Sequence, residues 1–217
     1  MFDVGTILEN YGLFGVFVEI TAIELANVYF MRDAVAHPCP LVTNCYRRVK
    51  AIKRAVYVFL VQLSAAYLSY FLAKLFWSFR IHPIHEELLN QESCTSDLAV
   101  AISIGCLIEG AATFFAKGFE KLVAENYEDE RKCSVANCLF SGLLCAFGIN
   151  YTGMYANPIV AWACTFNCLG VSHIGHLVVY WLSPLIGWYL AEIAFGSEDV
   201  IEEEEAEDVS VEKKKNE

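Results

Sequence analysis

The chain has 217 residues, of which 56% are hydrophobic, and its mean hydropathy is +0.41. Soluble domains usually hold about 45–50% apolar residues, so this composition argues against an ordinary soluble fold. The formal net charge is −11, and the sequence has no basic patch with interleaved aromatic residues, so a nucleic-acid partner is not expected. The apolar residues fall in runs about twenty residues long, which predicts an all-α membrane protein.

Five apolar runs are predicted to cross the membrane. In chain order they lie at residues 11–30, 55–79, 98–116, 134–151 and 174–195. Each is close to the length that crosses about 30 Å of hydrocarbon at a rise of about 1.5 Å per residue. The nine cysteines include no pair of C-x-x-C motifs, so we expect mostly free thiols and no metal site.

Lysine and arginine predict the orientation of these spans. Residues 31–54 and 117–133 are rich in both, whereas residues 80–97 hold only Arg80 and residues 152–173 hold neither. Because positively charged loops stay on the cytosolic side, the first two segments are expected in the cytosol and the last two on the opposite side.

Two loops begin with a polar residue followed by proline, at His37-Pro38-Cys39 and at Asn157-Pro158-Ile159. The polar side chain caps free N–H groups and proline fits the first helical position, so each loop predicts a helix start. The apolar stretches that follow, at residues 37–45 and 157–168, are too short to cross a bilayer. They are predicted to be half-helices that dip into the membrane.

His37 and Asn157 are 120 residues apart, and this offset predicts an internal repeat. The fourth span then matches the first and the fifth matches the second, whereas the third span has no counterpart. We therefore expect a channel domain at 1–196 with an incomplete first repeat, about 1–79, and a second repeat, about 97–196. An acidic tail at 197–217 is predicted to be disordered and cytosolic.

Each repeat has an odd number of crossings, so the copies are expected to be inverted in the membrane. Inverted repeats whose broken helices meet at the midplane are a recurrent transport architecture. The positive ends of the two half-helices would disfavour cations there and leave neutral solutes unaffected.

Several motifs resemble the aquaporin family. Tyr151-Thr152-Gly153 before the second box is similar to that family's approach to its Asn-Pro-Ala motif, and Trp181, Pro184 and Gly187 resemble the pattern of its last span. Glu109 matches a buried glutamate that braces the loops in the family. The resemblance covers about residues 11–195 and implies an aquaporin-like inverted repeat with five transmembrane helices and two re-entrant half-helices.

Two features resemble the unorthodox superaquaporin branch of the family. The first box ends in Pro38-Cys39, and Cys168 lies eleven residues after Asn157. The resemblance implies that Cys168 braces the structure, and packing is favoured over redox chemistry for it. The first span of the family is expected to be missing from this chain.

The resemblance also assigns positions along a pore. The pore-lining or filter candidates are Phe17, His37, Cys145, Met154, Asn157 and Val160. His37 replaces the usual asparagine, Ile159 replaces alanine, and the filter lacks its histidine and arginine. We therefore expect a wider or more apolar filter. His37 is either pore-lining or a satisfied buried histidine, and Glu24, within an apolar span, matches nothing in the family.

The sequence thus predicts a passive channel for water and small neutral solutes, including glycerol or peroxide, in a lipid bilayer. No cofactor and no catalytic constellation is expected. The alternative is a non-conducting, truncated form that assembles with complete aquaporin subunits and regulates them. The resemblance implies a homo-tetramer or such a hetero-assembly. The terminal Lys214-Lys215 resembles a retrieval signal for the endoplasmic reticulum, with the plasma membrane as the other possible location.

Overall fold

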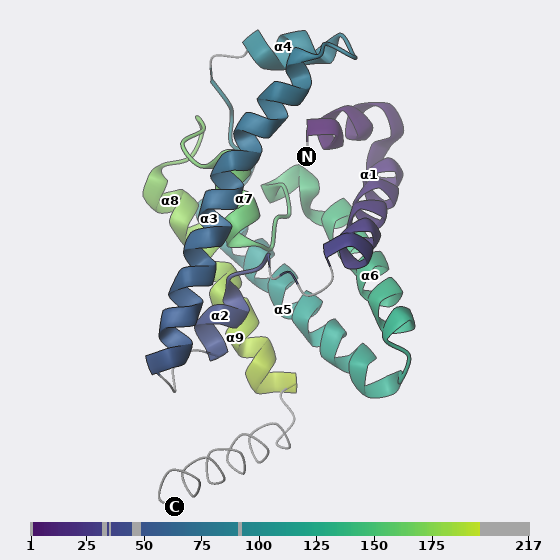
Figure 1. Ribbon diagram of the computed structural model, residues 1–217, viewed down its shortest axis with the longest axis vertical. Helices are drawn as coiled ribbons and strands as arrows, with labels where there is room; N and C mark the ends of the chain where they lie inside the picture. The colour runs from purple at the N-terminus through teal and green to yellow at the C-terminus, as the bar shows by residue number, and fades with distance from the viewer. Residues whose placement is uncertain (1, 32–33, 35, 45–48, 91–92, 196–217) are drawn as a thin grey trace, which may run out of the picture.

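The computed structural model describes residues 2–31, 34, 36–44, 49–90 and 93–195 (Figure 1). Its elements in chain order are α1 (Phe2–Met31), α2 (Cys39–Asn44), α3 (Val49–Ser78), α4 (Ile84–Asn90), α5 (Ile102–Asn126), α6 (Glu130–Thr152), α7 (Pro158–Thr165), α8 (His173–Leu177), the π-helical turn η1 (Val178–Leu182) and α9 (Ser183–Phe195). In the described part of the chain, Thr95 and Leu169 form an isolated β-bridge and every other regular element is a helix. The predicted all-α class is confirmed, and the predicted tail at 197–217 lies outside the described residues.

Five helices are long and apolar enough to cross a membrane. They are Val4–Met31, Ile52–Ser78, Ile102–Asn126, Glu130–Thr152 and His173–Phe195. The number of spans is therefore as predicted, but the third one is shifted from the expected residues 98–116. Ala101 has extended backbone angles (φ −57°, ψ 146°), so the helix begins after it. Beyond residue 116 the charged side chains favour helix, and α5 continues past the apolar run.

The long helices pack around the two short helices α2 and α7. α1 lies along α6, and α5 packs against both α9 and α6 (Figure 1). α3 packs against α7, α2 and α4. At the offset of 120 residues, α1 corresponds to α6, α2 to α7, and α3 to the α8–α9 segment, whereas α5 has no counterpart among the described helices.

α5 and α9 approach closely where two glycines face each other. A Cβ atom added to Gly187 would collide with the carbonyl of Gly110, so no larger residue fits at this crossing. Just before it, η1 provides the local change in winding that Pro184, which has no N–H, requires. The hydroxyl of Ser183 donates to the carbonyl of Val178 at 2.9 Å. The glycine and proline of the predicted last-span pattern therefore set how α9 packs.

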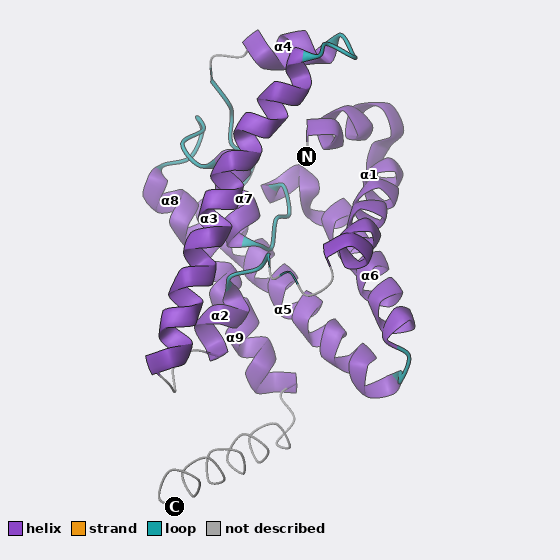
Figure 2. Ribbon diagram, viewed as in Figure 1, coloured by secondary structure: helices purple, strands orange, loops and turns teal. Residues whose placement is uncertain are grey.

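The loops before α2 and α7 meet in the middle of the bundle, where Figure 2 draws them as non-helical segments. From this point α7 runs upward and α2 downward in the view of Figure 1. The N-terminal ends of the two short helices therefore face each other. We call this meeting point the junction, formed by Ala36, His37, Ala156 and Asn157.

Candidate functional site

The two short helices begin in the same way. Asn157 has extended backbone angles, and its side-chain Oδ1 accepts the N–H of Ile159 at 3.0 Å. On the other side, Nδ1 of His37 accepts the N–H of Cys39 at 3.2 Å. His37 thus performs with a ring nitrogen the capping role that Asn157 performs with an amide oxygen.

The junction is closed by a reciprocal pair of hydrogen bonds. The Nε2–H of His37 donates to the carbonyl of Ala156 at 2.8 Å, and the Nδ2–H of Asn157 donates to the carbonyl of Ala36 at 3.3 Å. Because Nδ1 of His37 already accepts a hydrogen bond, its proton lies on Nε2 and the ring is neutral. Both ring nitrogens of His37 are therefore engaged by backbone, whereas the amide of Asn157 keeps a second N–H.

The surroundings of His37 hold it in place. Its ring lies against the indole of Trp188, with 5.0 Å between ring centroids. The side chain of Gln62 donates to the carbonyl of His37 at 3.5 Å, and Pro38 and Cys39 behind it are fully buried. His37 is half-buried and its ring nitrogens are both bonded, and a pore-lining role for it stays a prediction.

Glu109 braces the loop between α6 and α7 from inside α5. Its side chain is completely buried. One carboxylate oxygen accepts the hydroxyl of Thr152 at 2.6 Å and the N–H of Tyr155 at 3.2 Å. The other accepts the N–H of Ala156 at 2.7 Å. A carboxylate without such donors is costly inside a membrane, so these bonds bring the loop to α5.

The same loop contains strained backbone that these bonds hold. Met154 and Ala156 both have positive φ angles, 48° and 45°, which cost non-glycine residues about 1–2 kcal/mol each. The hydroxyl of Thr113 shares its one hydrogen between the carbonyls of Glu109 at 2.9 Å and Ala156 at 3.3 Å. The phenol of Tyr180 donates to the carbonyl of Thr152 at 2.8 Å. Together with Glu109 they present Ala156 and Asn157 to the junction.

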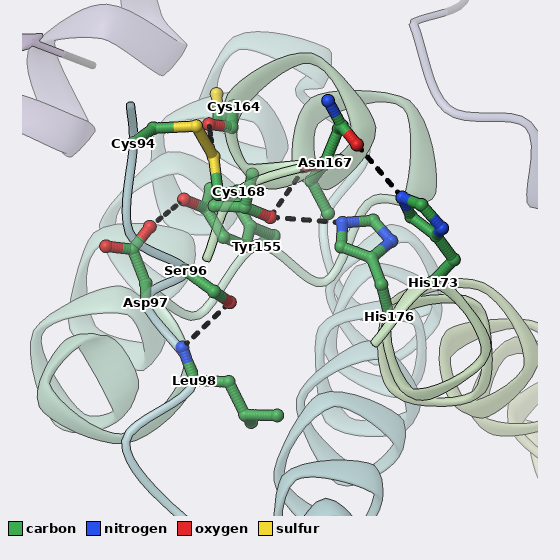
Figure 3. Close-up of a disulfide and its surroundings, with 12 residues drawn as sticks. Cys94, Ser96, Asp97, Leu98, Tyr155, Cys164, Asn167, Cys168, His173 and His176 are labelled. Carbon is green, nitrogen blue, oxygen red and sulfur yellow. Dashed lines mark hydrogen bonds between the residues drawn. A yellow bond between two sulfur atoms is a disulfide. The ribbon is translucent and has the colours of Figure 1, made fainter. Parts of the chain in front are cut away.

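Tyr155 links this loop to the segment before α5. Its hydroxyl donates to the carboxylate of Asp97 (Figure 3). Burial and the nearby Asp97 charge raise the pKa of Tyr155 above its usual range, so the phenol stays protonated and remains a donor.

The remaining filter candidates come from four places: α1, α6, the loop after α6, and α7. Phe17 on α1 packs over Gly142, where an added Cβ atom would come within 2.8 Å of the Phe17 carbonyl. Cys145 on α6 is half-buried with a free thiol, and Val160 lies half-buried in the first turn of α7. The side chain of Met154 turns toward α6 and rests on Gly148. Their pore-lining roles stay predictions.

The state of one cysteine differs from its prediction. Cys168 is bonded to Cys94 in a disulfide that closes a separation of 74 residues (Figure 3). It therefore braces the structure through a covalent bond. The prediction that Cys168 packs as a free thiol was wrong. Six other described cysteines form no disulfide, as expected. A signal did exist in the sequence, because both cysteines lie in the two segments predicted to face away from the cytosol, where disulfides persist.

Other residues of the site were not found from the sequence. The polar side chains of Thr113, Tyr155 and Tyr180 contribute to the loop network, but nothing in their spacing singles them out. Thr152 was noted as part of a family motif, without a role in this network. Glu24 is half-buried on α1 and interacts with Asn27. In the part of the chain that the structure describes, no three His, Cys, Asp or Glu side chains gather as metal ligands do.

No protein-family model matches the sequence, and no solved structure matches it. Several curated proteins do match the sequence. "Aquaporin-11" of Milnesium tardigradum is 26% identical over 187 residues, which are 86% of this chain and 66% of that protein. "Putative aquaporin-10" of Caenorhabditis elegans is 23% identical over 225 residues, 99% of this chain and 76% of that protein. "Putative aquaporin-12B" of Homo sapiens is 28% identical over 121 residues, 55% of this chain and 40% of that protein.

The chain is a distant aquaporin homologue. Its curated relatives are aquaporins, and it is an integral membrane protein with several helices long and apolar enough to cross a membrane. The family resemblance predicted from the sequence is confirmed. The chain spans 66% and 40% of the lengths of the tardigrade and human relatives, so their activity is not transferred to this aquaporin homologue directly.

Proposed function

We propose that this aquaporin homologue is a passive channel for water and small neutral solutes, with its path through the junction. The observation that carries the proposal is the reciprocal pair of hydrogen bonds between the two half-helix loops. It holds the N-terminal ends of α2 and α7 together inside a bundle of membrane-spanning helices. Backbone that is not helical at this depth is tolerated where it is buried or lines a water path.

The polar groups of the junction suit a neutral solute. The second N–H of the Asn157 amide is a donor for water or a hydroxyl group. The positive end of α7 disfavours cations at the same place, without acting on an uncharged molecule. A solute that accepts this hydrogen bond regains one of the hydrogen bonds that it made to water. The free-energy cost of dehydrating the solute is therefore small.

The filter candidates support solutes larger than water. Phe17, Cys145 and Val160 carry neither a fixed charge nor a strong hydrogen-bond donor, so nothing there selects for water alone. Glycerol and hydrogen peroxide are both small, neutral and rich in acceptors. We include both among the proposed solutes.

Stopped-flow permeability of proteoliposomes tests the proposal. The wild-type chain is compared with Asn157→Asp, and Asn126→Asp at the exposed end of α5 is the matched control. We expect osmotic and glycerol permeability above that of empty vesicles, lost in Asn157→Asp and kept in Asn126→Asp. Folded, inserted wild-type protein with the permeability of empty vesicles would refute the channel proposal.

A second candidate is a non-conducting subunit that assembles with complete aquaporin subunits and regulates them. One observation favours it. α5 packs against both α6 and α9, and none of the described helices fills the corresponding place beside α1 and α3. Co-expression with a complete aquaporin distinguishes the two: this role requires co-purification and changed permeability of the partner. Homo-tetramers, in contrast, would form from the purified chain alone.

The membrane in which the protein resides is also a proposal. The terminal Lys214-Lys215 would retain it in the endoplasmic reticulum. Replacing both lysines by serine should move a fluorescently tagged protein to the plasma membrane. An unchanged distribution would show that the two lysines are not a signal.

A further inference from the structure

A short segment before α5 ties together both ends of the α7 half-helix. We call this segment, Cys94–Ala99, the strap. It lies between α4 and α5 in the chain, and its contacts are with the two segments that flank α7. Figure 3 shows it beside the loop after α7, with the disulfide at one end and Asp97 further along.

The first attachment of the strap is to the segment that follows α7. Cys94 is joined to Cys168 by the disulfide. The N–H of Leu169 donates to the carbonyl of Cys94 at 2.8 Å, and the N–H of Ser96 donates to the carbonyl of Leu169 at 2.7 Å. The two backbone bonds form the isolated bridge between Thr95 and Leu169.

The second attachment is to the loop that precedes α7. Asp97 accepts the hydroxyl of Tyr155, whose own N–H is bonded to Glu109. The N–H of Ala99 donates to the carbonyl of Tyr151 at 2.9 Å. The strap therefore connects the residues before Asn157 with the residues after α7, and the disulfide is its covalent anchor.

The disulfide is open to attack from one side. Cys94 is exposed, whereas Cys168 is only 6% exposed. A reductant in solution therefore reaches the Sγ of Cys94, and Cys168 is the leaving group. We propose that the Cys94–Cys168 disulfide is a redox-sensitive clamp, which holds the α6–α7 loop in its conducting position and releases it when a dithiol reduces the bond.

The reduction step balances with a dithiol as the named reactant. One thiolate of the dithiol attacks Cys94 and forms a mixed disulfide, and Cys168 leaves as a thiolate and takes a proton. The second thiol of the dithiol then attacks the mixed disulfide and releases Cys94, which is protonated in turn. The dithiol is oxidised to a disulfide, and its two protons end on the two cysteines.

The consequence for the loop follows from its strained backbone. Met154 and Ala156 hold positive φ angles against their intrinsic preference. Their anchors are Glu109 and Thr113 on α5, and the strap holds the same loop through Tyr151 and Tyr155. With the disulfide open, the strap keeps only its hydrogen bonds to Leu169, Tyr151 and Tyr155, so the segment from Gly153 to Asn157 samples more conformations.

This inference rests on the proposed channel function for its effect on transport, but its effect on the loop is measured independently. Hydrogen exchange of the oxidised and reduced protein, in detergent, reports on the N–H groups of Tyr155 and Ala156. The reductant is tris(2-carboxyethyl)phosphine, which takes the oxygen of a water molecule as the disulfide becomes two thiols. We expect severalfold faster exchange at both positions after reduction. Cys133→Ser, which removes a free thiol, should behave like wild type.

The double variant Cys94→Ser/Cys168→Ser should match the reduced protein without any reductant. Equal exchange rates in the oxidised, reduced and double-variant proteins would overturn the clamp. In proteoliposomes, we expect the same phosphine to lower the permeability of wild type severalfold and to leave the double variant unchanged. If the oxidised wild-type protein shows no permeability, the channel proposal is refuted. The hydrogen-exchange comparison then still tests whether the disulfide clamps the loop. A conducting wild type with the same permeability before and after reduction overturns the clamp's effect on transport.

Discussion

His37 and Asn157 each donate a side-chain hydrogen bond to the carbonyl group that precedes the other. The bonds are 2.8 Å from His37 to Ala156 and 3.3 Å from Asn157 to Ala36. Each of the two side chains also caps its own half-helix through its second polar atom. The junction is thus nearly symmetric in its hydrogen bonds although one partner is an imidazole and the other an amide.

His37→Ala should destabilise the protein by about 1–3 kcal/mol, because it leaves the Cys39 N–H without its partner and removes the shorter of the two hydrogen bonds to the Ala156 carbonyl. His37→Asn should be milder, since the amide oxygen of asparagine caps α2 as Asn157 caps α7. Thermal unfolding in detergent measures both. An alanine variant as stable as wild type would show that the ring is not needed at the junction.

The fully buried carboxylate of Glu109 accepts three hydrogen bonds from the α6–α7 loop. In Glu109→Gln, the new NH₂ group faces an N–H group of the loop, so one donor loses its acceptor. We expect a loss of about 1–3 kcal/mol in the free energy of unfolding. Glu125→Gln, at an exposed position on the same helix, is the control and should stay within about 0.5 kcal/mol of wild type. Equal unfolding temperatures for the two variants would contradict the bracing role.

The crossing of α5 and α9 depends on the absence of a side chain at Gly187. Gly187→Ala places a methyl group against the carbonyl of Gly110 and should cost about 1–3 kcal/mol. Gly5→Ala is the matched control, because no atom lies within 4 Å of the added carbon there. Size-exclusion chromatography in detergent after mild heating measures the fraction that stays monodisperse. The prediction fails if Gly187→Ala survives heating as well as Gly5→Ala.

The orientation predicted from lysine and arginine has a direct test. Glu86→Cys places a thiol on α4, and Glu128→Cys places one at the turn between α5 and α6, at the opposite end of the molecule (Figure 1). A maleimide that does not cross membranes should label Glu128→Cys from the cytosolic side and Glu86→Cys only from the other side. Wild type measures the background of native thiols. The reverse labelling pattern would invert the topology and place the disulfide in the cytosol.

The sequence by itself determined that the protein lies in a membrane, how many spans it has, and where the two half-helices start. Runs of apolar residues long enough for a bilayer have no other stable placement, and a polar residue before proline is a local signal that requires no partner. The sequence also singled out Glu109, through its match to the glutamate that braces the loops in the aquaporin family. The family assignment followed from motifs of the same local kind.

Only the tertiary structure decided which groups meet. The partner of Cys168 lies 74 residues away, and nothing in its local sequence distinguishes a free thiol from a bonded one. The neutral state of His37 depends on Cys39 and Ala156 together, and Ala156 is brought there by Glu109 and Thr113 on α5. Such contacts arise from the packing of helices distant in sequence, and residue periodicity does not encode them. The start of α5 at Ile102 has the same origin, since the segment before it is held by loops that belong to other helices.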